Sequence, residues 1–204
     1  MTYGASIGSH DLTGKRKYLL LVCVYIFFMA VGARAVSFNS YTLFSQIKSL
    51  VSSELDARNQ PFLSTFLNVF IGRIIEFSVI FVSGLTIFGI PVACVQLGLC
   101  ALKIGLISGG LYKIGGLEGF GCYALLFMPF ALACAVICII LTAQSCIFSS
   151  KLCKSVFIKP SINAPSDIKL YFQRGAVLFA FICFFASIES AAGALFGSMF
   201  ADIC

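Results

Sequence analysis

The chain has 204 residues, of which 60% are hydrophobic and only 11% are charged. A soluble domain is about 45–50% apolar and about 25% charged, so this chain carries too little charge to cover a compact body in water. A spanning helix uses about 20 residues, so the length allows roughly five crossings and leaves no room for a separate soluble domain. We therefore expect an all-α polytopic membrane protein whose helices are in contact with membrane lipid.

The amino-terminal region precedes the first crossing. Residues 1–17 are rich in glycine and serine and have no apolar period, so we predict a disordered cytoplasmic tail. The first hydrophobic run covers residues 18–36. Its basic flank and the small-residue tripeptide Ala33-Arg34-Ala35 also fit a cleaved signal peptide, but the long tail before the run favours an uncleaved anchor.

A polar stretch, residues 37–60, follows the first span. Apolar residues recur within it at helical spacing, which predicts a short amphipathic helix on the outer membrane surface. Pro61 is expected to open the next helix, where proline is tolerated.

Four further spans are predicted over residues 62–88, 91–111, 120–148 and 170–200. The uncharged turn Gly89-Ile90-Pro91 separates the first two of these spans, and the glycine-rich stretch 112–119 separates the next two. Pro129 is expected to kink the span over 120–148. The five spans and their connections form one transmembrane domain over residues 18–200.

The basic residues predict the orientation of the spans. The formal net charge is +6, and the two densest basic groups are Lys15-Arg16-Lys17 and the stretch 151–174. With five crossings both groups fall on one side, which the positive-inside rule makes cytoplasmic. We therefore expect the amino terminus inside and the carboxyl terminus outside. Neither group is interleaved with base-reading or stacking side chains, so no nucleic-acid partner is expected.

Charged residues inside the predicted spans are costly and are usually paired or face a wet cavity. At about 1.5 Å of rise per residue, Glu76, Lys103 and Glu189 each lie about 18–21 Å from the cytoplasmic end of their span, and therefore at a similar depth. We hypothesise a buried polar cluster in which Lys103 bridges the two carboxylates. Its predicted members are Arg73, Glu76, Gln96, Lys103 and Glu189. The alternative is that each residue snorkels or pairs locally, as Arg73 and Glu76 can at i,i+3.

Small residues form a seam along the last span. The seam consists of Ala186, Ser190, Gly193 and Gly197. Small residues let helix backbones approach closely and mark a packing face. We expect this face to pack inside the chain's own bundle, and a partner protein is the alternative.

No catalytic constellation can be assembled from this sequence. The chain has ten cysteines but one histidine, His10, which lies in the predicted tail, so neither a catalytic triad nor a zinc site is expected. No nucleotide-binding glycine fingerprint occurs. We predict no enzymatic activity, no metal and no cofactor. Cys122 and Cys204 could both lie near the outer surface, where a disulfide is chemically permitted.

Five short motifs occur in a fixed order between residues 62 and 148. They are Phe62-Leu63-Ser64-Thr65-Phe66-Leu67-Asn68, Gly84-Leu85-Thr86-Ile87-Phe88-Gly89-Ile90-Pro91, the stretch 105–110, Gly116-Leu117-Glu118-Gly119 and Met128-Pro129. This order resembles the stage II sporulation protein M family of endospore-forming bacteria. The family core would comprise Asn68, Gly84, Phe88, Gly89, Pro91 and Pro129. The chain departs from the family at Phe130-Ala131, where the family often has polar residues.

The resemblance implies a function for the chain. It would be a scaffold of the engulfment machinery in the cell membrane, holding peptidoglycan hydrolases and other engulfment membrane proteins at the septum without cutting peptidoglycan itself. The alternative is a small transporter or transporter subunit in which Glu76, Lys103 and Glu189 line a substrate or proton path.

Overall fold

The computed structural model describes residues 7–36, 49, 62–157 and 164–201 of the chain. Its helices are α1 (Ile7–Ala35), α3 (Phe62–Gly84), α4 (Gly89–Leu126), α5 (Met128–Phe157) and α6 (Ala164–Ala201). No strand occurs within those ranges. Each of the five helices has an apolar stretch long enough to cross a membrane. The prediction of an all-α, multi-pass membrane protein is confirmed.

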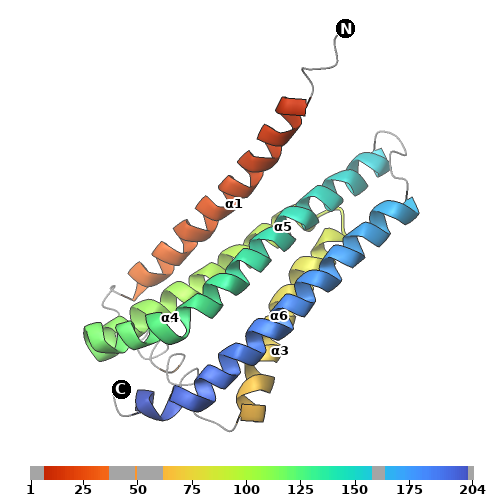
Figure 1. The fold of residues 1–204 in the computed structure, drawn as a ribbon. Coiled ribbons are helices and arrows are strands. Elements are labelled where there is room, and N and C mark those ends of the chain that lie inside the picture. The colour runs from red at the N-terminus through yellow and green to blue at the C-terminus, as the bar shows by residue number, and fades with distance from the viewer. Residues whose placement is uncertain (1–6, 37–48, 50–61, 158–163, 202–204) are drawn as a thin grey trace.

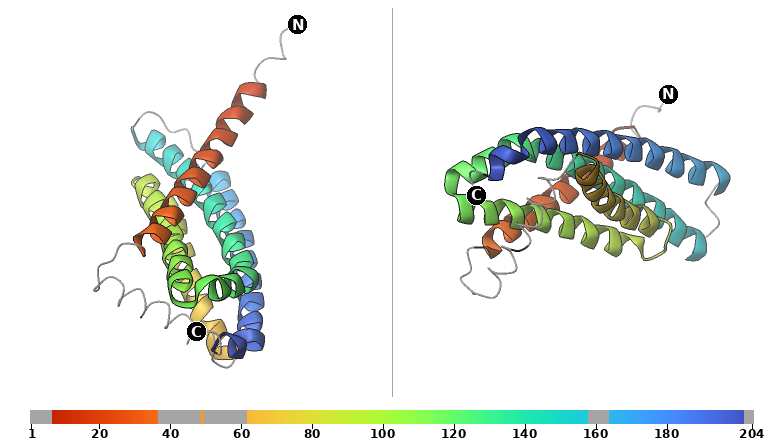
Figure 2. Two further views of the ribbon diagram at one scale, coloured as in Figure 1. Left: turned by 90° about the vertical axis from the view of Figure 1, so that its left-hand side faces the viewer. Right: turned by 90° about the horizontal axis from the view of Figure 1, so that it is seen from below.

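The helices form an elongated bundle in which α1 crosses α4 and α3 packs beside α6 (Figure 1). The α3–α4 turn and the facing ends of α5 and α6 lie at one end of the bundle, and the first residues of α1 project away from the other helices towards the same end (Figures 1 and 2). The start of α1 at Ile7 and the end of α6 at Ala201 lie towards opposite ends, as an odd number of crossings requires. Which end faces the cytoplasm stays a prediction.

Helix α1 begins at Ile7, so the tail predicted as disordered over residues 1–17 is helical from that residue. The polar residues between Ile7 and Lys17 include no proline. A helix nucleated by the apolar run therefore propagates outward at little cost. The amphipathic helix predicted over 37–60 lies outside the described residues, apart from Ser49. Cys204 also lies outside them, so its pairing with Cys122 is not tested.

Helix α4 is longer than the predicted span over 91–111. It breaks at Gly116, whose φ of 62° and ψ of −148° leave the helical region, and it resumes as far as Leu126. This φ favours glycine because other side chains rarely adopt it. The chain thus turns inside the predicted glycine-rich connection.

The predicted helix over 120–148 is interrupted next to Pro129: α4 ends at Leu126, α5 begins at Met128, and Phe127 between them belongs to neither helix. Phe127 N–H still donates to Tyr123 O, whereas Pro129 has no N–H to continue the helical bonding, so the interruption lies where the proline predicts it. The apolar stretch before it, from Phe120, belongs to the last part of α4.

The main core joins all five helices. Its buried side chains include Tyr25 of α1, Ile80 of α3, Leu97 of α4, Leu141 of α5 and Ile182 of α6. Many other large apolar side chains point away from the bundle and are exposed. An apolar exterior of this extent is what a helix bundle in lipid requires.

Candidate functional site

Three charged residues meet in the middle of the bundle. Arg73 Nη1 on α3 lies 3.4 Å from Glu76 Oε2, and Arg73 Nη2 lies 3.8 Å from Glu189 Oε2 on α6. The side chains of Arg73 and Glu76 are 17% and 15% exposed, and Glu189 is 1% exposed. We call Arg73, Glu76 and Glu189 the ion-pair cluster. The guanidinium fork can reach two carboxylates at once, which a lysine ammonium does less well.

Local sequence explains how the ion-pair cluster forms. Arg73 and Glu76 are three apart on α3, so they share one helix face. Glu189 stands among small residues of α6: Ala186 and Ser190 are fully buried and Gly193 is also buried. These small residues let α6 approach the rest of the bundle closely.

The seam of small residues on α6 therefore packs inside the chain's own bundle, where α6 contacts α3 and α5. Ser190 Oγ donates to Ala186 O at 2.7 Å, so this hydroxyl is satisfied within its helix. The surroundings of Gly197 lie outside the described residues. Ala186, Ser190 and Gly193 thus pack against other helices of the same chain, as predicted.

Lys103 does not occupy the place predicted for it. The cation in contact with both carboxylates is Arg73, whereas the Lys103 side chain is exposed. Val95 and Leu99 are exposed on the same helix, and Lys103 continues their stripe at helical spacing. The depth of a residue along a helix does not determine which face of the helix it lies on. Lys103 lies on the face of α4 that points away from the other helices.

Gln96 also stays outside the ion-pair cluster. Its side-chain amide lies 3.9 Å from the sulfur of Cys100, one turn along the same helix. A contact of this length to sulfur is weak. Gln96 therefore serves local packing within α4 rather than the carboxylates of α3 and α6.

Arg73, Glu76 and Glu189 are charged groups inside the spans, where such groups are usually paired or face a wet cavity. The cavity between α1 and α4 and the small cavity between α5 and α6 are lined by other residues. Neither of these two cavities gives a path to the cluster.

A second polar arrangement holds the turn between α3 and α4. Ser149 Oγ on α5 lies 2.8 Å from Thr86 O and 3.2 Å from Ile87 O, so its hydroxyl donates to the turn carbonyls. Gly89 ends this turn, where a Cβ would collide with Ser83 O. We call the turn and the α5 and α6 side chains that bind it the clamped turn.

The last part of α3 is bound in the same way. Ser145 Oγ of α5 donates to Ile80 O at 2.9 Å, and Tyr171 Oη of α6 donates to Phe81 O at 2.7 Å. Ser145 and Tyr171 also lie 3.0 Å apart. A Cβ on Gly84 would collide with the Tyr171 hydroxyl. Glycine is therefore required where the tyrosine crosses α3.

Sequence reasoning missed Ser145, Ser149 and Tyr171. Ser145 and Ser149 are four residues apart, so both hydroxyls lie on one face of α5. Two serines at this spacing within an otherwise apolar span are the signal that could have found them, since each hydroxyl in lipid needs a partner.

The predicted family-core residues fall into two groups. Gly84 and Gly89 are buried in the clamped turn, whereas Phe88 and Pro91 beside them are exposed. Asn68 on α3 is also exposed, and so is Pro129. The two glycines have a clear structural role, and Asn68 has a side chain available to another molecule.

Asn68 lies on the face of α3 that points away from the bundle. Gly72 follows one turn later, and nothing lies within 4 Å of where its Cβ would be. Leu67, Ile71 and Ile75 flank this pair and are exposed. We call these five residues the outward face of α3. Asn68 lies six residues from the helix start, or about 9 Å along its axis.

Among residues 7–36, 62–157 and 164–201, no group of three or more histidine, cysteine, aspartate or glutamate side chains is placed to hold a metal ion. The eight cysteines whose side chains are described are free thiols.

Comparisons of the chain with protein-family models, with curated proteins and with solved structures found no match.

Proposed function

We propose that this protein is a non-catalytic membrane scaffold that binds the transmembrane segments of partner proteins. One observation carries the proposal: Asn68 is exposed on the outward face of α3, inside an apolar stretch long enough to cross the membrane. The hydrocarbon core has no water to bind an amide, so a polar side chain facing it favours a partner helix.

The neighbourhood of Asn68 suits a helix as partner. A carboxamide offers two N–H donors and a carbonyl acceptor, so it can bind an amide or hydroxyl of a second helix. The open space at Gly72 lets that helix approach the backbone of α3. An interhelical hydrogen bond of this kind contributes about 1–2 kcal/mol in model peptides, and the flanking apolar side chains add packing.

The resemblance supports a more specific role. Asn68 belongs to the first motif shared with the stage II sporulation protein M family, and the clamped turn contains the second. On this basis we propose that the partners are peptidoglycan hydrolases and other engulfment proteins, and that the scaffold holds them at the septum in the cell membrane.

Deletion of the gene in its native host, followed by membrane imaging of sporulating cells, tests this role. We expect arrested engulfment, and we expect peptidoglycan hydrolases to co-purify with the wild-type chain. Asn68→Leu should reduce their recovery. Gly121→Ala is the matched control, because Gly121 also has open space around its Cβ position but lies on α4. Normal engulfment with no hydrolase recovered would overturn the proposal.

A transporter is the second candidate, favoured by the three charged side chains of the ion-pair cluster that meet inside the spans. Arg73 and Glu76 keep some exposure, so an ion could approach them more readily than Glu189. Glu76→Gln should abolish substrate or proton flux in vesicles if the cluster conducts. It should leave flux unchanged and alter only the abundance of the chain if the cluster is structural.

A further inference from the structure

A small polar cavity lies between α5 and α6, beside the clamped turn. Its polar lining comes from Gln144 and Lys151 of α5 and from Asp167, Tyr171 and Arg174 of α6. The cavity volume is about 60 Å³, which is room for a few water molecules at most. A small polar group can therefore enter it and a long hydrocarbon chain cannot. We call it the α5–α6 cavity.

Packing fixes the walls of the α5–α6 cavity. The ring of Tyr171 stacks on Phe148 with centroids 4.7 Å apart, and its hydroxyl donates to Phe81 O. Lys151 Nζ donates to Asp167 Oδ1 at 2.9 Å, which joins α5 to α6 nearer the ends of the two helices. These contacts hold the two helices on either side of the cavity.

Arg174 supplies a cation that the chain itself does not neutralise. Its side chain is exposed, and it makes no hydrogen bond or ion pair with the residues that the structure describes. Arg174 lies eight residues into the apolar span Ser166–Gly193, about 12 Å along the helix axis. A charged group at such a depth is costly unless it meets a counter-charge, and a long arginine side chain can extend towards the head groups. Arg174 therefore favours an anionic group at the lipid boundary.

Apolar side chains flank the α5–α6 cavity on the surface of the bundle. Ile147 of α5 and Leu170 of α6 both line the cavity and are 42% and 45% exposed. Lys151 is 49% exposed beside Asp167, so a second positive charge lies at the same opening. Cations set between exposed apolar side chains complement an amphiphile that has an anionic head and a hydrocarbon tail.

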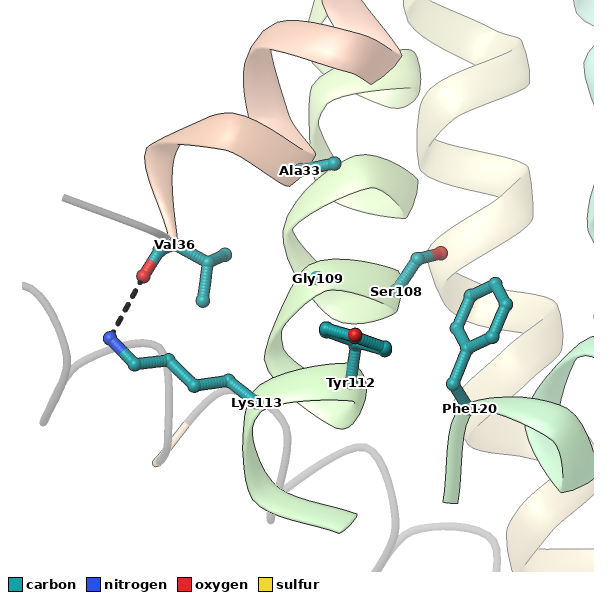
Figure 3. A pocket seen from close by; sticks show the side chains of 7 residues that line it. All are labelled: Ala33, Val36, Ser108, Gly109, Tyr112, Lys113 and Phe120. Atoms are coloured by element: carbon teal, nitrogen blue, oxygen red, sulfur yellow. Dashed lines mark hydrogen bonds between the residues drawn. The ribbon is translucent and has the colours of Figure 1, made fainter. Parts of the chain in front are cut away.

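The larger cavity between α1 and α4, of about 570 Å³, does not offer this combination. The charged residue of its lining is Lys113, and this ammonium donates to Val36 O at 3.1 Å (Figure 3). An anion is therefore expected at the α5–α6 cavity and not at the larger one.

We infer that the α5–α6 cavity binds the phosphate of one anionic phospholipid through Arg174 and Lys151, with the acyl chains outside it against Ile147 and Leu170. A guanidinium presents a fork of N–H donors that matches a phosphate, and basic pockets between membrane helices bind anionic head groups. With Asp167 included, two cations and one carboxylate line the cavity, so an anionic lipid is favoured over a zwitterionic one. The inference stands independently of the proposed scaffold role.

Native mass spectrometry of the unmodified full-length chain tests the inference. The chain is purified in detergent, freed of lipid, and titrated with phosphatidylglycerol and separately with phosphatidylcholine. We expect the first phosphatidylglycerol to bind about tenfold more tightly than the first phosphatidylcholine, and inorganic phosphate at the same concentration should not displace it. Equal affinities for the two lipids would overturn the inference. Displacement by inorganic phosphate would also overturn it, because the cavity would then bind a soluble anion.

Arg174→Gln tests the contact that carries the inference. We expect it to lower the affinity for phosphatidylglycerol about tenfold, through loss of charge-assisted hydrogen bonds, and to leave phosphatidylcholine unaffected. Lys169→Gln is the matched control, because Lys169 is an exposed cation of the same helix that does not line the cavity. Equal losses in the two variants would indicate attraction to the basic surface in general and would contradict the site.

Asp167→Asn tests whether the phosphate shares Lys151. The substitution releases Lys151 from its ion pair and removes the negative charge from the cavity lining, so the affinity for phosphatidylglycerol should rise severalfold. A purely structural ion pair predicts an unchanged or lower affinity, which would contradict the assignment. Thermal unfolding without added lipid checks the fold: Arg174→Gln and Lys169→Gln should melt like the unmodified chain, because both side chains are exposed.

Discussion

The guanidinium of Arg73 on α3 lies 3.8 Å from the carboxylate of Glu189 on α6, and Glu189 is 1% exposed. This pair joins two helices that are far apart in the chain and packed together in the bundle. A buried ion pair is not itself a strong source of stability, because both ions have lost their water. Removal of one partner is costly, because it leaves the other charge buried and uncompensated.

Arg73→Met should therefore destabilise the bundle by about 3–5 kcal/mol. The measurement is thermal unfolding of the purified chain in detergent, together with its abundance in membranes. Arg174→Met is the control, since Arg174 is exposed on α6, and it should leave the melting temperature nearly unchanged.

A double variant separates loss of the ion pair from loss of packing. Arg73→Met combined with Glu189→Gln removes the uncompensated charge on α6 and should recover part of the lost stability. If the double variant unfolds no later than Arg73→Met alone, the contact between α3 and α6 does not depend on this pair.

Ser149→Ala should weaken the clamped turn. The substitution removes the donor to Thr86 O and Ile87 O, which are part-buried, and Thr86 O keeps the Gly89 N–H as a donor. The expected loss is that of an ordinary hydrogen bond, about 0.5–1.5 kcal/mol. Ser187→Ala is the matched control, because that exposed hydroxyl bonds only to Cys183 O of its own helix. Thermal unfolding followed by circular dichroism compares the two, and equal melting temperatures would contradict a clamping role.

The crossing of α1 over α4 should be sensitive to a single methyl group. A Cβ at Gly105 would collide with Met29 O, so Gly105→Ala must push the helices apart, at about 1–3 kcal/mol. Gly72→Ala meets open space and gains helix propensity, so it should be neutral or stabilising by up to about 1 kcal/mol. Unfolding midpoints in detergent should fall for the first variant only.

Protease protection of terminal tags tests the predicted orientation. In intact cells a tag before Met1 should be protected, and a tag after Cys204 should be cleaved by an external protease, because the basic residues favour a cytoplasmic amino terminus. Cleavage of the amino-terminal tag in intact cells would reverse the topology.

The helices were predictable because an apolar run long enough to cross lipid has few alternatives to a helix. All five spans are present. The boundary between α4 and α5 at Phe127 lies two residues before Pro129, where a proline predicts an interruption. The position of the Gly116 break was harder to assign, since the stretch 112–119 contains three glycines.

The depth of the charged residues along their helices was predictable, but the helix face on which each of them lies was not. Equal depth predicts that Lys103 meets Glu76 and Glu189, whereas the structure places Arg73 against both carboxylates. The i,i+3 spacing predicts only the contact of Arg73 with Glu76. The hydroxyls of Ser145 and Ser149 were missed because serine in a membrane helix commonly bonds to its own backbone. Their acceptors lie on α3 and in the turn that follows it, and only the packing of α5 against α3 reveals them.

Site-specific photo-crosslinking in the native membrane shows whether the outward face of α3 binds a partner helix. A photoreactive amino acid replaces Ile71, beside Asn68 and Gly72, and Val177 of α6 is the control because both side chains are 53% exposed. We predict a crosslink from position 71 to a membrane protein with a peptidoglycan-degrading domain, which Asn68→Leu removes and position 177 does not form. Crosslinks to lipid alone at both positions would contradict the account.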